Sequence, residues 1–377
     1  MTGHKGESSG PAAELRAVLG EMAPALHAAW PDDDSFPARV AWQKALAERG
    51  WAAPHWPVAD GGRGLGAADR LACQTELAAA GAPDIAGIFG IKNVGPALSA
   101  FGTPEQRGHL ERILTTDEIW VQGFSEPGSG SDLASLRTRA VADGDEFVVN
   151  GQKVWTSDGM LATHCMLLVR TDPNAPRHQG ISVLLVPLDT PGIERRPLRQ
   201  MTGEEGFAEL FFTDVRVPRS ALLGPLNEGW RVTMTTLGHE RVGVIEMAVA
   251  LERDVREAVE GFDDGIADPV LRQELARRYV ESRTVGLLGA SILRELESGH
   301  PPGPAESVIK LGWSLTTQRL SESLLTAAGP TALAGGANGD GAEVHRFLRG
   351  RASTIAAGTT EVMKNILAER VLGLPRS

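Results

Sequence analysis

The stretch Phe124-Ser125-Glu126-Pro127-Gly128-Ser129-Gly130-Ser131-Asp132 is the most informative part of this 377-residue chain. Small residues and hydroxyls are concentrated in it, so its backbone N–H groups are exposed and a bulky anionic ligand can approach them closely. Downstream, Asp143-Gly144 and Asn150-Gly151 lie between alternating apolar runs and predict two hairpin turns. The strand that follows them ends in Trp155-Thr156-Ser157. A loop of oxygens and amides facing an indole and a hydroxyl suits a flat heteroaromatic ring with polar edges.

The apolar periodicity divides the chain into three parts. From residue 11 to about 119, Ala and Leu recur at three- and four-residue spacing, which predicts helices. One helix start is Thr103-Pro104-Glu105-Gln106, where Thr103 can cap and Gln106 can reach back. From about 120 the period changes to that of strands, which we predict at residues 137–141, 146–149, 166–170, 181–186 and 210–217.

The third part is helical again. One helix is predicted from Asp268-Pro269 to Ser298, and another from 304 to 328, ended by Gly329-Pro330. We therefore predict an α+β protein with an N-terminal α-helical domain (1–119), a middle antiparallel β-barrel or sandwich domain (120–228) and a C-terminal helical domain (229–377). The strand block and the last helices could then form the walls of a cleft.

Net charge and the length of the apolar runs exclude some classes of binding partner. The formal net charge of -11 argues against a nucleic-acid surface, and no apolar run reaches the roughly 18 residues of a membrane span. Cys73 and Cys165 lie far apart and have no metal-type spacing, and His164 beside Cys165 would point to the opposite face of a strand. We expect no metal site, no secretory signal in the first nine residues, and a cytoplasmic location.

Several motifs together resemble the acyl-CoA dehydrogenase family of flavoproteins. The 124–132 stretch is similar to the flavin loop of that family, and Asn150-Gly151-Gln152-Lys153-Val154-Trp155-Thr156-Ser157 to its second flavin strand. Phe211-Phe212-Thr213-Asp214-Val215-Arg216-Val217-Pro218 and the tail from Gly358-Thr359-Thr360-Glu361 to Gly373-Leu374-Pro375 also match. The resemblance implies bound FAD, a C-terminal four-helix bundle, and α,β-dehydrogenation of an acyl thioester.

The resemblance also implies which residues contact the cofactor. Ser125 and the backbone of Gln122 and Phe124 would meet the pyrimidine side of the flavin, and Trp155 would lie against the ring. Ser157 would lie near flavin N5. The remaining contacts would come from Gly130 and Ser131 at the pyrophosphate and from Thr359 and Glu361 in the tail. Ser131 and Arg241 are also expected at the substrate, whereas Glu126 and Asp132 are expected to fix the loop.

The catalytic base is a departure from the common family pattern. Many relatives carry a glutamate immediately before the Gly-Thr of the tail, where this chain has Ala357. The resemblance leaves the backbone N–H of Ala357 as a donor to the thioester carbonyl. It places the base on Glu240, because some branches of the family have Glu followed by Arg on the first long helix of the C-terminal domain. His239 is a rival base, since histidine titrates near neutral pH.

Partners and alternatives follow from the same resemblance. The substrate would be an acyl-CoA or an acyl-carrier-protein thioester, and the electron acceptor an electron-transferring flavoprotein. In many members of the family, an Arg-x-x-Phe-Gly segment and a Gln bind the FAD of a neighbouring subunit. This chain lacks the first at residues 261–265 and the second near Leu325. A homo-oligomer (dimer or tetramer) is expected, with a hetero-oligomer possible. A flavin monooxygenase on the same fold and a non-catalytic scaffold subunit are the alternative functions.

Overall fold

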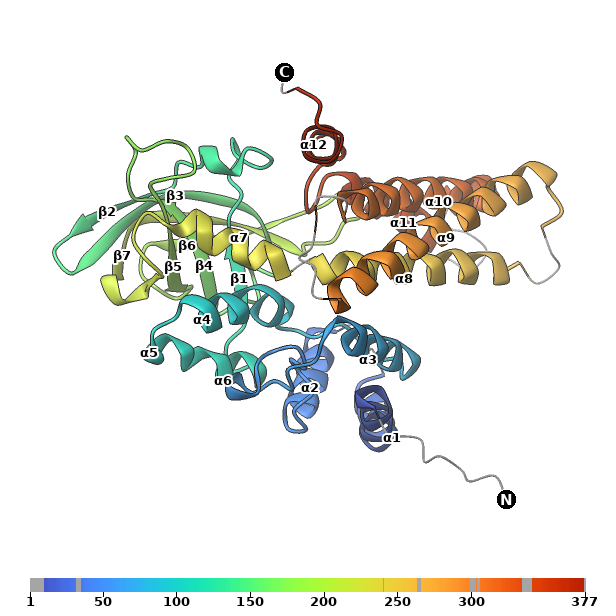
Figure 1. Cartoon of the computed structure of the whole chain (residues 1–377), viewed down its shortest axis with the longest axis horizontal. Helices are drawn as coiled ribbons and strands as arrows, with labels where there is room; N and C mark the ends of the chain where they lie inside the picture. The colour runs from blue at the N-terminus through green and yellow to red at the C-terminus, as the bar shows by residue number, and fades with distance from the viewer. Residues whose placement is uncertain are drawn as a thin grey trace. The chain divides into compact units, whose positions relative to one another are not determined.

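The computed structural model describes residues 10–31, 35–239, 241–262, 266–298, 303, 306–333 and 341–375 (Figure 1). Two compact units make up the chain. Met1–Leu198 with Glu205–Glu240 forms the first, and Arg199–Glu204 with Arg241–Ser377 forms the second. No helix within the described residues is long and apolar enough to cross a lipid bilayer.

The first unit begins with helices, as predicted. They are α1 (Pro11–Ala29), α2 (Phe36–Ala47), α3 (Ala67–Ala79), α4 (Gly95–Phe101), α5 (Pro104–Arg107) and α6 (His109–Leu114), with short η1 (Val58–Asp60) and η2 (Gly90–Val94). The capping box expected at the start of α5 is confirmed, because Thr103 and Gln106 each accept a hydrogen bond from the backbone of the other. The first helices share a core built from Leu15, Leu19, Trp42, Leu46 and Trp51.

One sheet of eight strands follows. Its strands are β1 (Trp120–Gly123), β2 (Arg139–Asp143), β3 (Glu146–Ser157), β4 (His164–Arg170), β5 (Ile181–Pro187), β6 (Ile193–Leu198), β7 (Phe207–Pro218) and β8 (Leu222–Leu223). The order is β6-β7-β3-β2-β4-β5-β8, with β1 beside β4. Because β4 is parallel to both β1 and β2, the sheet is mixed rather than purely antiparallel.

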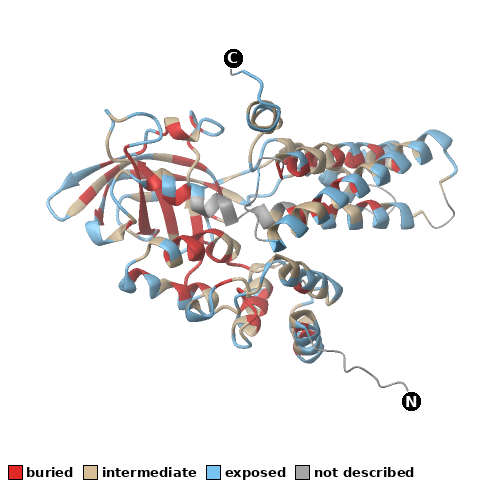
Figure 2. Ribbon diagram, viewed as in Figure 1, coloured by how far each residue is buried: buried red, intermediate tan, exposed pale blue. Residues whose placement is uncertain are grey.

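Alternate residues of β4 enter two different cores. Cys165, Leu167 and Val169 pack with residues of β7 and β5, which lie far apart in the strand order, so the sheet curves around this core. Met166 and Leu168 pack instead with α4, α6, η2 and α7 (Gly229–His239). Both faces of the central strands are therefore covered, which explains their nearly continuous apolar sequence. Figure 2 shows the buried residues along these strands and on the helices beside them.

The hairpin turn predicted at Asn150-Gly151 is wrong. The chain continues through it as the long strand β3, and the register against β7 shifts between Val149 and Gly151. Gly151 has a φ of 155°, and a Cβ there would lie 2.5 Å from the Thr138 hydroxyl, so the glycine serves a bulge with a close approach. The turn at Asp143-Gly144 is confirmed between β2 and β3.

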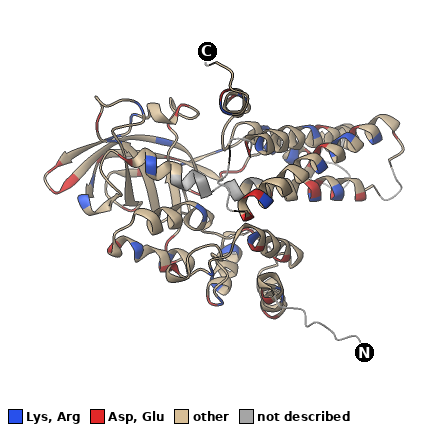
Figure 3. Cartoon of the chain, in the orientation of Figure 1, with Lys and Arg blue, Asp and Glu red and all other residues tan. Residues whose placement is uncertain are grey.

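The second unit contains the remaining helices. They are α8 (Arg241–Glu260), α9 (Pro269–Glu297), α10 (Ser307–Leu333), α11 (Ala342–Gly350) and α12 (Thr360–Ile366), with η6 (Arg351–Thr354) and η7 (Leu367–Val371). The predicted start of α9 is confirmed by Asp268, which caps Val270, and the predicted stop at Gly329 by its non-helical φ of 66°. Leu251, Leu275 and Leu320 from α8, α9 and α10 share one core. The expected helical bundle is therefore present, and Figure 3 shows charged residues along its helices.

Candidate flavin site

A tight turn shapes the loop that follows β1. Glu126 and Ser129 exchange two backbone hydrogen bonds of 2.9 and 3.0 Å around Pro127-Gly128. The Glu126 carboxylate, which is 9% exposed, accepts the backbone N–H of Arg137 at 2.7 Å and of Thr138 at 2.8 Å. The expectation that Glu126 fixes the loop is confirmed.

Lys153 on β3 is a further partner of this loop. Its side chain is fully buried, and Nζ donates to the Glu126 carboxylate and to the carbonyl of Phe124, both at 2.9 Å. Burial lowers the pKa of Lys153, and the charge of Glu126 restores part of it, to about 8. At neutral pH the pair is therefore a buried ammonium and carboxylate that join the loop to β3.

Trp155, on the same strand, presents an aromatic face. Its backbone has a φ of 60°, uncommon for a bulky residue, and its side chain is 57% exposed. The edge of the indole packs against Phe207, with the ring centroids 5.8 Å apart and the planes at 84°. Such an exposed, supported aromatic face suits stacking with a planar ligand. Ser157, at the end of β3, is half-buried.

Two strands of this region carry unpartnered polar atoms, and the loop carries open glycines. Within the described residues, the buried amide nitrogen of Gln122 on β1 and the buried hydroxyl of Thr156 on β3 find no hydrogen-bond partner. Buried polar atoms ordinarily have one, so a ligand or water must supply it. A Cβ on Gly128 or Gly130 would meet no described atom within 4 Å, so the fold itself does not require these glycines, and the backbone of the loop is open to a ligand. The residues present therefore fit a flavin.

The second unit carries the predicted tail residues. Ala357 has a φ of 53° and Gly358 a φ of 97°, so the chain makes a left-handed turn at the predicted donor. Thr359 is the N-cap of α12 and accepts the N–H of Val362, and Glu361 lies in the first turn of that helix. The preceding η6 is fixed by Lys310, a 4% exposed residue whose Nζ donates to the Ser353 carbonyl at 2.6 Å. Burial lowers the pKa of Lys310.

The predicted base lies outside the described residues. Helix α7 ends at His239 and α8 begins at Arg241, so Glu240 stands between the two helices in sequence. The side chains of His239 and Arg241 are likewise not described. Of the other predicted contacts, Ser125 is half-buried, Gly130 and Ser131 are exposed, and Phe124 packs against the helical core.

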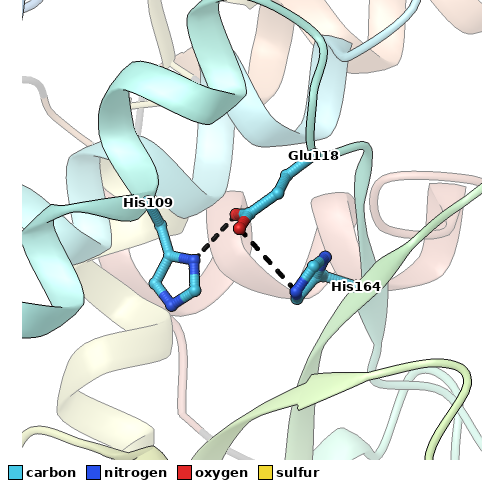
Figure 4. Close-up of side chains that lie close together, drawn as sticks. All are labelled: His109, Glu118 and His164. Atoms are coloured by element: carbon cyan, nitrogen blue, oxygen red, sulfur yellow. Dashed lines mark hydrogen bonds and ion pairs between the residues drawn. The ribbon is translucent and has the colours of Figure 1, made fainter.

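A second charged cluster lies at the start of β1 (Figure 4). The buried Glu118 carboxylate accepts hydrogen bonds from Arg112 and from the Trp120 indole, and lies 2.7 Å from His109 Nδ1 and 3.8 Å from His164 Nε2. Burial raises the pKa of Glu118, but its contacts with His109, Arg112 and Trp120 outweigh this effect and lower the pKa to about 2. Because both oxygens already accept N–H groups, we interpret the cluster as an ion-pair network.

Sequence reasoning missed two features of the site. Lys153 was part of a matching motif but received no role, and Thr156 was not assigned to the cofactor. The signal for Lys153 was a lysine inside a predicted strand segment, directly before the apolar Val154 and Trp155, a place where a buried charge requires a partner.

Comparison with known proteins identifies the family. Models of the acyl-CoA dehydrogenase N-terminal, middle and C-terminal domains match residues 12–117, 122–215 and 227–372. The chain is 42% identical over 350 residues to the acyl-CoA dehydrogenase IpdE1 of Mycobacterium tuberculosis, covering 92% of this chain and 90% of that protein.

Solved structures agree with this result. The steroid ACAD Tcur3481-Tcur3483 superposes with a TM-score of 0.83 at 31% identity, over 97% of each chain. The ChsE4-ChsE5 complex from M. tuberculosis does so with a TM-score of 0.78 at 33% identity, again over 97% of each chain. The chain belongs to the acyl-CoA dehydrogenase family of FAD-dependent oxidoreductases.

Proposed function

We propose that Glu240 is the base that removes the α-proton of an acyl-CoA thioester. Bound FAD supplies the acceptor for the hydride that leaves the β-carbon. The observation that carries this proposal is the alanine at 357, a side chain that cannot take a proton, together with Glu240-Arg241 at the alternative family position. A carboxylate on the far side of the thioester from the flavin is what the opposed loss of the two hydrogens requires.

The left-handed turn at Ala357 supports a second role. Removal of the α-proton places negative charge on the thioester carbonyl oxygen, and a fixed N–H donor stabilises it. We propose that the backbone N–H of Ala357 is this donor. The hydrogen bond from Lys310 to Ser353 fixes η6, which leads directly into the turn.

We infer that the protein works with a second, different chain. Two similar structures carry paired names, Tcur3481-Tcur3483 and ChsE4-ChsE5. A cavity of about 540 Å³ in the second unit reaches Gly261 and Phe262, where the family's Arg-x-x-Phe-Gly segment is missing, and its charged lining is Asp254, Glu257, Glu343 and Arg346. Three carboxylates against one guanidinium disfavour the pyrophosphate of another copy's FAD.

The substrate class and electron acceptor complete the proposal. The likeness to the steroid ACAD favours an acyl-CoA whose acyl group is attached to a steroid. We propose an electron-transferring flavoprotein as acceptor. We also propose a cytoplasmic location, which the two free, buried cysteines support.

Anaerobic mixing of the oxidised holoprotein with a panel of acyl-CoA thioesters tests this function. We expect the flavin absorbance to bleach, and Glu240→Gln to keep the flavin while bleaching roughly 10²–10⁴-fold more slowly. The matched control is Glu246→Gln on α8. An unimpaired Glu240→Gln variant rejects Glu240 as the base, whereas oxygen consumption without a thioester requirement favours a monooxygenase.

A further inference from the structure

We propose that Lys153 is a positioning residue for the cofactor: it orients the Phe124–Ser125 peptide so that the N–H of Ser125 is presented to bound FAD, while Glu126 balances its charge. The inference rests on the proposed function, because it takes the 124–132 loop as the place where the flavin binds.

The orientation of one peptide carries the argument. Lys153 Nζ holds the Phe124 carbonyl at 2.9 Å, and the peptide bond between Phe124 and Ser125 is trans, as are the other peptide bonds of the described residues. In a trans peptide the C=O and the following N–H point in opposite directions, so the N–H of Ser125 is directed away from Lys153. Among the described residues, no acceptor contacts this N–H, and Ser125 is half-buried. A half-buried donor of this kind is available to a ligand.

A second contact fixes the next peptide. The carbonyl of Ser125 accepts the backbone N–H of Val154 at 2.9 Å. Two consecutive residues of β3 therefore hold the two peptide carbonyls on either side of Ser125, and Trp155 follows them directly. The donor at Ser125 and the aromatic face at Trp155 are set by the same short piece of strand.

The carboxylate of Glu126 explains how a buried lysine is tolerated here. Glu126 receives the ammonium and two backbone N–H groups from residues 137 and 138, so its buried charge is compensated by three donors. A side chain without a donor at 153 would leave the Phe124 carbonyl without this hydrogen bond and the orientation of the peptide less restrained. A hydrogen bond from this N–H to bound flavin would also stabilise the electron-rich reduced form, so the orientation of the N–H would affect the midpoint potential.

A variant that removes both charges tests whether Lys153 positions the Phe124–Ser125 peptide, without leaving a buried charge unpaired. The double variant Glu126→Gln/Lys153→Met removes both charges together, and we expect it to fold while binding FAD about tenfold more weakly or worse, the effect of one lost hydrogen bond. FAD affinity is measured by fluorescence on the purified protein, and the midpoint potential of the bound flavin should fall. Arg216→Met, which breaks an exposed hairpin pair in the same unit, is the control and should change neither quantity.

Hydrogen exchange of the Ser125 amide in the wild-type protein gives a second test that needs no variant. We expect rapid exchange in the apoprotein and protection when FAD is bound. An amide already protected without FAD, or unprotected with it, overturns the proposal, as does wild-type affinity in a folded double variant. A wild-type protein that binds no FAD at all refutes the proposed function instead.

Discussion

Two buried lysines, one in each unit, are compensated in different ways. Lys153 in the first unit is 0% exposed and forms an ion pair with a buried carboxylate. Lys310 in the second is 4% exposed, and its hydrogen bond goes to the neutral carbonyl of Ser353. No carboxylate forms an ion pair with Lys310 within the part of the chain that the structure describes. Burial lowers the pKa of both ammonium groups, but only Lys153 has a counter-charge that offsets it.

The difference determines what each lysine can do. A lysine with a buried counter-charge cannot be removed without leaving that charge alone, so the pair enforces one arrangement of the loop. A lysine that donates to a carbonyl holds a segment at lower cost and can be replaced more easily. Both lie next to predicted functional backbone, Lys153 beside Ser125 and Lys310 behind the turn to Ala357. The comparison therefore predicts a graded series of effects on stability.

Replacing Lys153 with methionine alone should have the largest effect. It leaves the Glu126 carboxylate buried without its counter-charge, which costs about 3–5 kcal/mol of unfolding free energy. Urea denaturation of the apoprotein measures the loss. The Glu126→Gln/Lys153→Met double variant should recover part of it, since neither charge remains, although a glutamine at 126 can accept only one of the two backbone N–H groups of Arg137 and Thr138. A single variant as stable as the wild type would show that the buried pair is not the reason for the lysine.

Glu118 extends the comparison to a buried carboxylate with several donors. Its folded pKa of about 2 lies below the usual value of 4.5. Folding therefore gains stability from this group above pH 4.5 and loses it as the pH falls toward 2, by about 3 kcal/mol in all. The stability of Glu118→Gln should lack this part of the acid dependence. The free energy of unfolding of both proteins is measured by urea denaturation between pH 5 and pH 2. An equal decrease in the wild type and the variant would contradict this prediction.

The sequence predicted the elements that simple periodicity or capping defines. The start of α9, the capping box of α5 and the break at Gly329 depend on local chemistry, and all three are confirmed. The hairpin turn predicted at Asn150-Gly151 was wrong because Gly151 serves the close approach to Thr138. The same Asn-Gly dipeptide is also typical of hairpin turns, so the sequence alone does not distinguish the two cases. β6 was missed because this edge strand contains charges and Pro197.

In the candidate site, too, local motifs were predicted from the sequence and long-range contacts were not. The motif letters predicted the candidate flavin loop and Trp155, but the partners of Lys153 lie 27 and 29 residues away along the chain, and no local pattern indicates such a pairing. The unpartnered atoms of Gln122 and Thr156 are also properties of packing, which only coordinates reveal. Family resemblance supplied Glu240 and the N–H of Ala357, and these remain predictions.

The smallest effect in the series is expected for Lys310→Met. The Ser353 carbonyl loses its donor, but the cost of burying an ammonium is relieved at the same time, so the unfolding free energy should fall by only about 1–2 kcal/mol. Urea denaturation measures it, with Lys364→Met on the exposed side of α12 as a control expected to stay within about 0.5 kcal/mol of the wild type. The variant should also bleach more slowly with acyl-CoA if η6 sets the turn at Ala357. A loss as large as that of Lys153→Met would mean that Lys310 balances a negative charge after all, and the contrast between the two lysines would disappear.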